Sequence, residues 1–509
     1  MPGPEELTRE ELLVVVDRQA GQLAAQDRQI AGMAGQLSEL AEANEALAAK
    51  LARLEHLLSR NSSNSSSPPS QDDGPGKPPP PEKAGRGRSG PARARGKQPG
   101  APGSHLAWTD TPDQRRELFP TGRCDCGAEL ADAADLGVAD RYQQHEIPQV
   151  RVTVTQYEQH RVECGCGRIH TGSRPEGARS GPVGYGPNLQ AFAVYLMVVQ
   201  FVPAHRVVDL LESLTGTAPS VGFVHGLLTR TAGLLGEVHD RIRALITLAH
   251  AVSVDETPLK VGPRTPKPGR RKANKYLLVA CTELYTHYLL GDRDLETFSA
   301  FVLTERARNG GIIVHDRYQN YDSAEFAGVL HQLCCQHLLR DLADAGQVYP
   351  DKDWPAQITR ALQGLIHQAN LARNTGRPSI EPEVLDTLTD RFKHGVRAGL
   401  SDTLNRGTRP GENKVRLLLE ALRNREADVL RFAHDLAVPP TSNQAERDLR
   451  PSKIQQRISG RLTSENRTQD RYTIRGYIST AIKHGRNGLA VLHDAILGRP
   501  WMPELPAPT

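Results

Sequence analysis

The chain has 509 residues, a formal net charge of +4 and seven cysteines. This length exceeds what one hydrophobic core usually supports, so we expect two or three folded units joined by linkers. No apolar run approaches the roughly 20 residues that a membrane-spanning helix needs, and the N-terminal residues lack the charged and then apolar pattern of a secretory leader. Composition therefore argues against a membrane protein and favours an intracellular one, in which cysteines serve as thiols or metal ligands.

The first 60 residues follow a heptad repeat. One series recurs every seven residues from Val16 to Leu58, with Asn44 among its members, and a second series, ending at Leu54, follows it by three positions. This seam of about six heptads predicts a coiled coil, or leucine zipper, and a single Asn at an a position favours a parallel homodimer or higher oligomer. An amphipathic helix packed on its own protein is the alternative.

Basic residues concentrate downstream of this segment. Residues 61–104 are rich in Ser, Pro and Gly with scattered Lys and Arg, which predicts a disordered basic linker. Residues 1–59 carry ten acidic and five basic side chains, whereas residues 446–486 carry four acidic and ten basic ones. This asymmetry indicates a polyanionic partner such as double-stranded DNA, although ordinary solvated surface gives similar counts. A further basic run, free of acids, contains Arg264, Lys267, Arg270, Arg271, Lys272 and Lys275.

Four cysteines are paired by their spacing. Each pair is followed by glycine, and an alternating run at residues 150–154 between the pairs predicts a strand. Two such pairs are typical of a zinc ribbon, so we expect one zinc ion in a zinc-ribbon-like domain over residues 105–180. The common zinc knuckle has two residues between its cysteines and these pairs have one, so a redox-active or reduced pair is the alternative. The four predicted ligands are Cys124, Cys126, Cys164 and Cys166.

Residues 181–248 have the apolar spacing of short helices. Helical runs are predicted at residues 189–199, 207–214 and from Val221 onward, with Pro187 in a first turn. These helices form either a helix-turn-helix that binds DNA or a plain helical scaffold.

From Ala251 the pattern changes to strands. Strand-like runs at residues 251–255, 276–281 and 286–290 precede a helical run and a further strand at residues 311–316. This order predicts an α/β fold with an RNase H-like core, in which Asp255 on the first strand meets Asp316 at the end of the fourth. Carboxylates are the ligands that Mg²⁺ and Mn²⁺ prefer, and phosphodiester chemistry uses two such ions.

A third acid is expected on a helix beside the strands. We take it to be Glu446, on a helix that Thr441 or Ser442 caps and that Pro451 breaks. Asp448 is its main competitor. The basic run that ends at Lys275 would then form a hairpin loop beside Asp255. The predicted phosphate contacts around Glu446 are Asn443, Arg447, Arg450, Lys453 and Arg457.

With these residues the chain resembles the insertion sequence 66 family of DDE transposases over nearly its whole length. The zipper, the linker, the paired cysteines and the run Asp255-Glu-Thr-Pro match the family pattern. The most specific matches are His315-Asp316 with Tyr318 and Tyr321, and the run Asn-Gln-Ala-Glu-Arg-Asp-Leu-Arg-Pro at residues 443–451.

The resemblance implies that Asp255, Asp316 and Glu446 are the first, second and third metal-binding acids. It also implies an RNase H-like core in two parts, residues 249–337 and 439–509, separated by a helical insertion over residues 338–438. Helical runs are predicted there at residues 332–342, 356–372 and 414–436. The implied activity is metal-dependent cleavage and strand transfer at the ends of an insertion sequence, in the cytoplasm at the nucleoid, with small accessory proteins as partners.

Several alternatives remain open at this stage. Related enzymes carry a Cys-x-x-His, matched by Cys334 and His337, as ligands or as core packing. His315 either orients a water or phosphate or is a buried structural histidine. The rival functions are a DNA-binding regulator without catalysis and an RNase H-like nuclease or resolvase without strand transfer. A tyrosine recombinase would need a nucleophile, but Tyr318, Tyr321 and Tyr472 are more simply packing or DNA contacts.

Overall fold

The computed structural model describes residues 106–176, 181, 183–265, 274–404 and 411–505, with a few isolated residues before residue 33. The predicted linker lies outside these residues, and so does the predicted coiled-coil seam except for Val16, an exposed helical residue. Beyond residue 105 the described chain divides into two compact units. The larger unit comprises residues 157–210 and 218–505, and the smaller comprises residues 106–156 and 211–217.

A five-stranded mixed sheet lies in the larger unit. Its order is β5-β4-β3-β6-β7, with β3 antiparallel to β4 and parallel to β6. The last five of the seven residues of strand β4 are buried without alternation, which is typical of a strand covered on both faces. The expected α/β class is therefore confirmed. The strands are β3 (Ala251–Leu259), β4 (Lys275–Cys281), β5 (Thr286–Gly291), β6 (Ile312–His315) and β7 (Leu330–Leu333).

A buried arginine fixes the register of the two strands that carry the predicted acids. The connection from β5 to β6 runs through α6 (Leu295–Phe298), a π-helical turn η3 (Ser299–Leu303) and α7 (Thr304–Arg308). In α7, the guanidinium of Arg306 donates to the carbonyls of Ala249 and His250 before β3, and to the carbonyl of Ile312 in β6. A Cβ at Gly311 would lie 2.3 Å from the Cζ of Arg306, so only glycine fits there.

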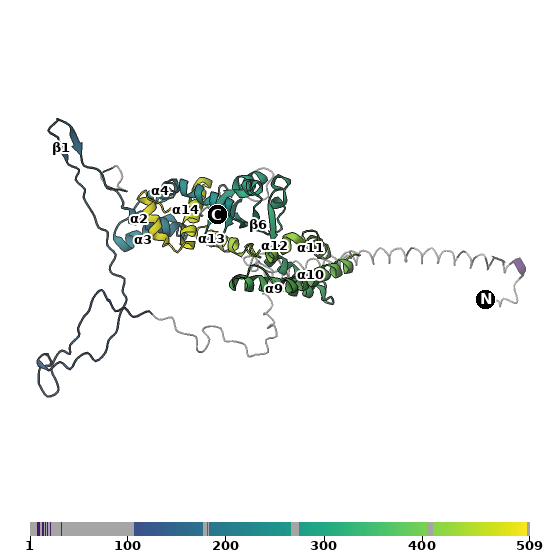
Figure 1. The fold of residues 1–509 in the computed structure, drawn as a ribbon, viewed down its shortest axis with the longest axis horizontal. Helices are drawn as coiled ribbons and strands as arrows, with labels where there is room; N and C mark the ends of the chain where they lie inside the picture. Colours follow the sequence, from purple (N-terminus) through teal and green to yellow (C-terminus); the bar gives the residue numbers. More distant parts are fainter. Residues whose placement is uncertain are drawn as a thin grey trace. The chain divides into compact units, whose positions relative to one another are not determined.

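Two hydrophobic clusters hold helices against the sheet. In one, Leu277 and Tyr288 of the sheet pack with Leu449 of α13 (Asn443–Ser459) and Tyr472 of α14 (Glu465–Lys483). In the other, β6 and β7 pack with a helical group between the second and third predicted acids. Figure 1 shows α9 and α10 of this group side by side. The group comprises α8 (Cys335–Val348), α9 (Trp354–Asn374), α10 (Pro382–Asp402), α11 (Glu412–Asn424) and α12 (Glu426–His434).

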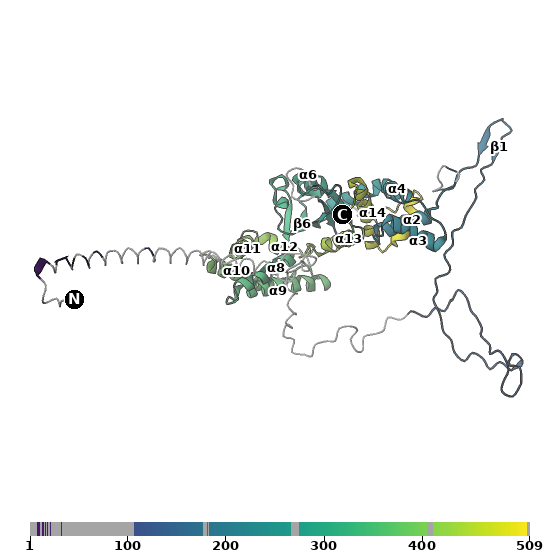
Figure 2. The ribbon, with the colours of Figure 1, turned by 180° about the vertical axis from the view of Figure 1, so that it is seen from behind.

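The predicted helices before the sheet are present. Helix α2 packs against α15 (Gly488–Ile496) and α4, and α4 packs against α14; Figure 2 shows this group from behind. Pro187 lies in the first turn of α2 as predicted, and the Ser220 hydroxyl caps α4 by accepting from the backbone N–H of Phe223. The helices are α2 (Pro187–Val198), α3 (Ala204–Thr215), α4 (Val221–Leu234) and α5 (Gly236–Leu248). No described helix is both long and apolar enough to cross a membrane.

Four local predictions are wrong. Residues 150–154 form no strand, because alternation without a pairing partner does not make a sheet. The predicted helix at residues 332–342 begins only at Cys335, after β7. The predicted helix at residues 414–436 is two helices, α11 and α12, and α13 runs through Pro451 without a break. Leu449 and Ser452, on either side of Pro451, are both buried, so tertiary packing outweighs the lost backbone hydrogen bond.

Acid is expected to destabilise the larger unit through His287 of β5. This ring is fully buried between His239 and Phe301. Burial lowers the pKa of His287 well below its ordinary value, and the charges of His239 and Arg243 lower it further. Because the unfolded chain takes up this proton more readily, stability is complete above the unfolded pKa of about 6.5 and is lost as the pH falls below it.

We therefore expect His287→Leu to flatten the acid side of the stability profile. Below pH 6.5, the free energy of unfolding of the wild type should fall more steeply than that of the variant, by up to about 1.4 kcal/mol per pH unit, the slope for uptake of one proton. Urea unfolding at pH 7.5, 6.0 and 5.0 measures it, with exposed His205→Gln as the control. Equal acid sensitivity in His287→Leu and the wild type would refute this origin.

Candidate active site

The sheet brings Asp255 and Asp316 to neighbouring positions. Ser253 of β3 pairs with Val314 of β6 in a parallel register, and the two acids each lie two residues farther along. Neighbouring strands are about 4.8 Å apart. Burial raises the pKa of Asp255 well above its ordinary value, and the carboxylates of Glu256 and Asp316 raise it further. The two acids thus form a crowded anionic site whose repulsion a divalent cation would relieve.

Glu446 lies in the first turn of α13, which packs against β3 and β4. With 3.6 residues per turn, Glu446 and the five predicted DNA contacts fall within about 120° of one side of this helix. The opposite side carries the buried Ala445, Leu449, Ser452 and Gln455. Glu446, the third of the predicted acids, therefore lies on the same side of α13 as the cationic side chains, opposite the side that packs on the core.

His337 of α8 links the three acids electrostatically. Its Nε2 lies 3.8 Å from Oε1 of Glu446, and its charge lowers the pKa of Asp255. Burial by itself lowers the pKa of His337, but a hydrogen bond with Cys334 and the charges of Cys334, Asp316 and Glu446 raise it to about 9. His337 therefore holds a proton more readily than an ordinary imidazole does, beside Glu446.

Cys334 supports this arrangement from behind. It is buried, and its Sγ accepts a hydrogen bond from the backbone N–H of Ser442, at 3.3 Å, next to the start of α13. The backbone N–H of Cys335 donates to the carbonyl of Pro440 at 2.9 Å. The start of α8 is thereby fastened to the start of α13, which sets His337 against Glu446. Ser442 is the N-cap residue of α13, but its side chain makes no capping hydrogen bond.

Asp448, the alternative to Glu446 as the third acid, has a structural role. Its Oδ2 accepts from Lys483 Nζ at 2.9 Å and from the Thr286 hydroxyl at 3.0 Å, and its Oδ1 accepts from Gln444 at 3.1 Å. The side chains of Asp448 and Lys483 are only 10% and 11% exposed. This carboxylate is therefore satisfied by partners inside the fold.

We expect Asp448→Asn to lower the free energy of unfolding by about 3 kcal/mol, because it leaves a buried lysine without its counterion. Urea unfolding measures the change. The matched control is Asp402→Asn, which removes the partner of Lys352 in a more exposed pair and should cost less than about 1 kcal/mol. Equal losses in the two variants would contradict the structural role of Asp448.

Glu256 is a fourth acid at this site that the sequence did not single out for a role. Its side chain is 2% exposed and accepts from Arg293 and, at 2.8 Å, from the hydroxyl of Tyr321. The Arg293 guanidinium also stacks on the ring of Tyr318, 3.5 Å from its centroid. Burial raises the pKa of Glu256 and the Asp316 charge raises it further, while Arg293 lowers it. Its only signal in the sequence was its place beside Asp255.

The Transposase IS66 family matches residues 183–470, more than half of the chain. The chain belongs to this family. The matched range contains the sheet, the helical group and α13, hence Asp255, Asp316 and Glu446. Residues 3–107 of the transposase match a family of unknown function, DUF6444. No curated protein is similar enough to count as a match.

The transposase exposes part of its predicted DNA-binding set. Arg447, Arg450 and Arg457 are exposed on α13, whereas Asn443 and Lys453 are partly buried. Arg264 is exposed, but Lys275 is held by Asp292 at 3.4 Å and Glu465 at 3.1 Å. Lys275 therefore has its charge matched within the fold. The remaining members of the predicted basic loop, Lys267, Arg270, Arg271 and Lys272, lie outside the described residues.

Each cysteine pair of the transposase forms the same tight turn. The backbone N–H of Gly127 donates to the carbonyl of Cys124 at 2.8 Å, and that of Gly167 donates to Cys164 at 2.7 Å. Both glycines have a positive φ, +93° and +80°, which favours glycine over other residues. The thiols are exposed and free. The first turn belongs to the smaller unit and the second to the larger, so one zinc held by both stays a prediction.

The remaining predicted residues have mostly packing roles. Tyr472 of α14 is buried against the sheet, and Tyr321 is buried and donates its hydroxyl to Glu256. His315 is fully buried, and its Nε2 lies 3.0 Å from Nδ1 of His331. Among the described residues, the group of three metal-ligating atoms that all lie within 4.8 Å of one another is His315, Asp322 and His331. The three catalytic candidates are less closely gathered.

Proposed function

We propose that this transposase is a DDE enzyme, in which Asp255, Asp316 and Glu446 hold two Mg²⁺ or Mn²⁺ ions on an RNase H-like core. The sheet order supports this proposal, because three antiparallel strands followed by a crossover to parallel strands is the predicted RNase H-like order. The observation that carries it is the position of His337, whose Nε2 lies 3.8 Å from Oε1 of Glu446 and whose charge interacts with those of Asp255 and Asp316.

The residues present suit divalent cations. Carboxylate oxygens are hard ligands, and the pKa of Asp255 is raised by burial and by the neighbouring carboxylates of Glu256 and Asp316. When bound, two ions about 4 Å apart would activate the attacking oxygen and stabilise the leaving oxygen of a phosphodiester. The positive charge of His337 would offset the repulsion between Glu446 and the other two acids. Arg293 and Tyr321 hold Glu256 in place by hydrogen bonds.

The exposed arginines of α13 would bind the DNA backbone beside the acids. Arg447, Arg450 and Arg457 share a helix side with Glu446, so a strand held by them passes over the carboxylates. Arg264 extends this positive surface from the end of β3. We further propose that the N-terminal coiled coil joins two copies, that the cysteine turns hold one zinc ion, and that accessory proteins assist. Cleavage at the element ends would then be followed by joining of the freed 3′ hydroxyls to target DNA.

A cleavage and joining assay tests the proposal. The substrate is labelled duplex carrying the DNA that flanks the gene, mixed with a target plasmid and Mg²⁺ or Mn²⁺. We expect nicks at the element boundaries with 3′ hydroxyl ends, then covalent joining to the plasmid, and neither in the presence of a chelator. Cleavage without joining would indicate a nuclease or resolvase, and binding without cleavage would indicate a regulator; either result overturns the proposal.

A further inference from the structure

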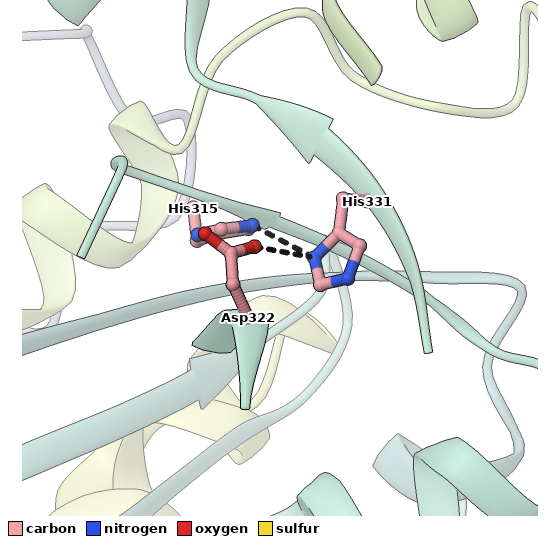
Figure 3. Close-up of side chains that lie close together, drawn as sticks. All are labelled: His315, Asp322 and His331. Carbon is pink, nitrogen blue, oxygen red and sulfur yellow. Dashed lines mark hydrogen bonds and ion pairs between the residues drawn. The ribbon is translucent and has the colours of Figure 1, made fainter. Parts of the chain in front are cut away.

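A second cluster of metal-ligating side chains lies next to Asp316 in the chain and includes none of the three predicted catalytic acids. His315 ends β6, His331 lies in β7, and Asp322 lies between them in the short helical turn η4 (Gln319–Asp322). Figure 3 shows the three side chains turned toward one another, with dashed lines from His315 and Asp322 that both end on Nδ1 of His331. This nitrogen lies 3.0 Å from Nε2 of His315 and 3.9 Å from Oδ1 of Asp322.

These distances suit a small tetrahedral ion. Zinc–nitrogen and zinc–oxygen bonds of about 2.0–2.1 Å at tetrahedral angles place neighbouring ligand atoms about 3.3 Å apart. The observed separations of 3.0 and 3.9 Å fall on either side of that value. Two imidazoles and one carboxylate prefer zinc-like ions to Mg²⁺, which takes oxygen ligands and water. The donor set therefore differs in chemistry from the all-carboxylate centre.

The surroundings orient two of the ligands. Arg425 donates to the other oxygen of Asp322 at 2.8 Å, leaving Oδ1 directed at His331. Arg431 donates to the backbone carbonyl of His331 at 2.8 Å. In metal sites, hydrogen bonds from neighbouring residues commonly orient the side chains that bind the ion. Asp428 takes up part of both positive charges, since it contacts Arg425 at 2.9 Å and Arg431 at 3.3 Å.

The cluster is also reachable from one side. A cavity of about 360 Å³ has Asp322, His331 and Arg425 in its lining, and the side chains of Asp322 and His331 are 36% and 16% exposed. His315 closes the opposite side, because it is fully buried against the ring of Tyr321. An ion entering from the cavity would meet three protein ligands and keep its fourth position toward water.

We infer that His315, Asp322 and His331 form a binding site for one zinc-like divalent ion, separate from the proposed DDE centre. His315 is the last residue of β6 and Asp316 follows the strand, and the cluster includes none of the three proposed catalytic acids. The ion would tie β6, η4 and β7 together and thereby fix both ends of the segment that follows Asp316. This site does not depend on the proposed transposition chemistry. When no ion is bound, the imidazoles of His315 and His331 share one hydrogen bond.

The test uses the full chain with the four predicted zinc-ribbon ligands and one predicted catalytic acid replaced. The reference protein carries serine at Cys124, Cys126, Cys164 and Cys166, and Asp255→Asn at the other centre. Zinc affinity and stoichiometry are measured by competition with a chromophoric chelator, and the ligand type by the absorption spectrum of bound Co²⁺. We expect one equivalent of zinc, and a Co²⁺ spectrum without the strong ultraviolet band that thiolate ligands give.

His331→Gln and Asp322→Asn in this reference protein should each weaken zinc binding by about tenfold or more. The matched control is His250→Gln, because His250 pairs with Asp435 at 2.6 Å without a second histidine in the pair; it should bind zinc as the reference does. Asp322 is the more exposed ligand, so its variant gives the answer where His331→Gln fails to fold. No zinc bound by the reference, a thiolate band, or equal affinity in Asp322→Asn would each overturn the inference.

Discussion

We expect Asp255→Asn to lower the rate of DNA strand cleavage by about 10³-fold or more, because it removes a ligand shared by the proposed ions, worth several kcal/mol of transition-state stabilisation. DNA affinity should be kept, since the exposed arginines of α13 are untouched. Single-turnover cleavage of labelled flanking DNA measures the first effect, and a gel-shift titration measures the second.

The same substitution should raise stability in metal-free buffer. Burial raises the pKa of Asp255, and the Glu256 and Asp316 carboxylates raise it further, so its ionised form costs folding energy at neutral pH. Stability from this group is present at low pH and is lost as the pH rises through the folded pKa. Asp448→Asn is the matched control and should move stability the opposite way. Wild-type cleavage by Asp255→Asn would contradict the assignment.

Glu446→Gln should abolish cleavage to a similar extent. Glutamine keeps the shape of the side chain and its place on α13 but loses the charge that faces His337, 3.8 Å away. Since the acids act as one unit, the double variant with Asp255→Asn should be no slower than either single variant. Single-turnover rates of the three proteins measure this.

The control for Glu446 is Glu383→Gln. Both glutamates lie in the first turn of a helix, but Glu383 is an exposed residue of α10, so its loss should leave cleavage unchanged. Full independence of the two active-site variants, with rate losses that multiply, would argue against a shared centre.

The strand residues before Asp255 and Asp316 could be predicted, because each run is mainly apolar. Strand β7 could not be predicted from the sequence. Its sequence, Leu-His-Gln-Leu, is short and half polar. The buried amide of Gln332 donates to the carbonyl of Val429 at 3.0 Å and accepts from the backbone N–H of Phe432 at 2.8 Å. These partners lie about a hundred residues away in α12, so no local sequence pattern predicts the strand. The same reasoning explains α13, where packing on both sides of Pro451 keeps the helix whole.

The candidate site was predictable in part. Asp255 and Asp316 follow from the strand order, and the sequence favoured Glu446 over Asp448. The structure adds a reason that no local pattern gives, because Asp448 pairs with Lys483, 35 residues away. Arg293 and its hold on Glu256 have no signal in the sequence. Nor does the cluster of His315, Asp322 and His331, because its ligand spacing matches no common metal motif and depends on the pairing of β6 with β7.

Iron-mediated backbone cleavage tests the central claim most directly. Fe²⁺ replaces Mg²⁺ at carboxylate sites and, with ascorbate and peroxide, generates radicals that cut the nearest polypeptide. If three carboxylates share one pair of cations, fragments should end near residues 255, 316 and 446, and Asp255→Asn should suppress the cuts near residue 446. Cuts near residues 255 and 316 without any near residue 446 would contradict the account.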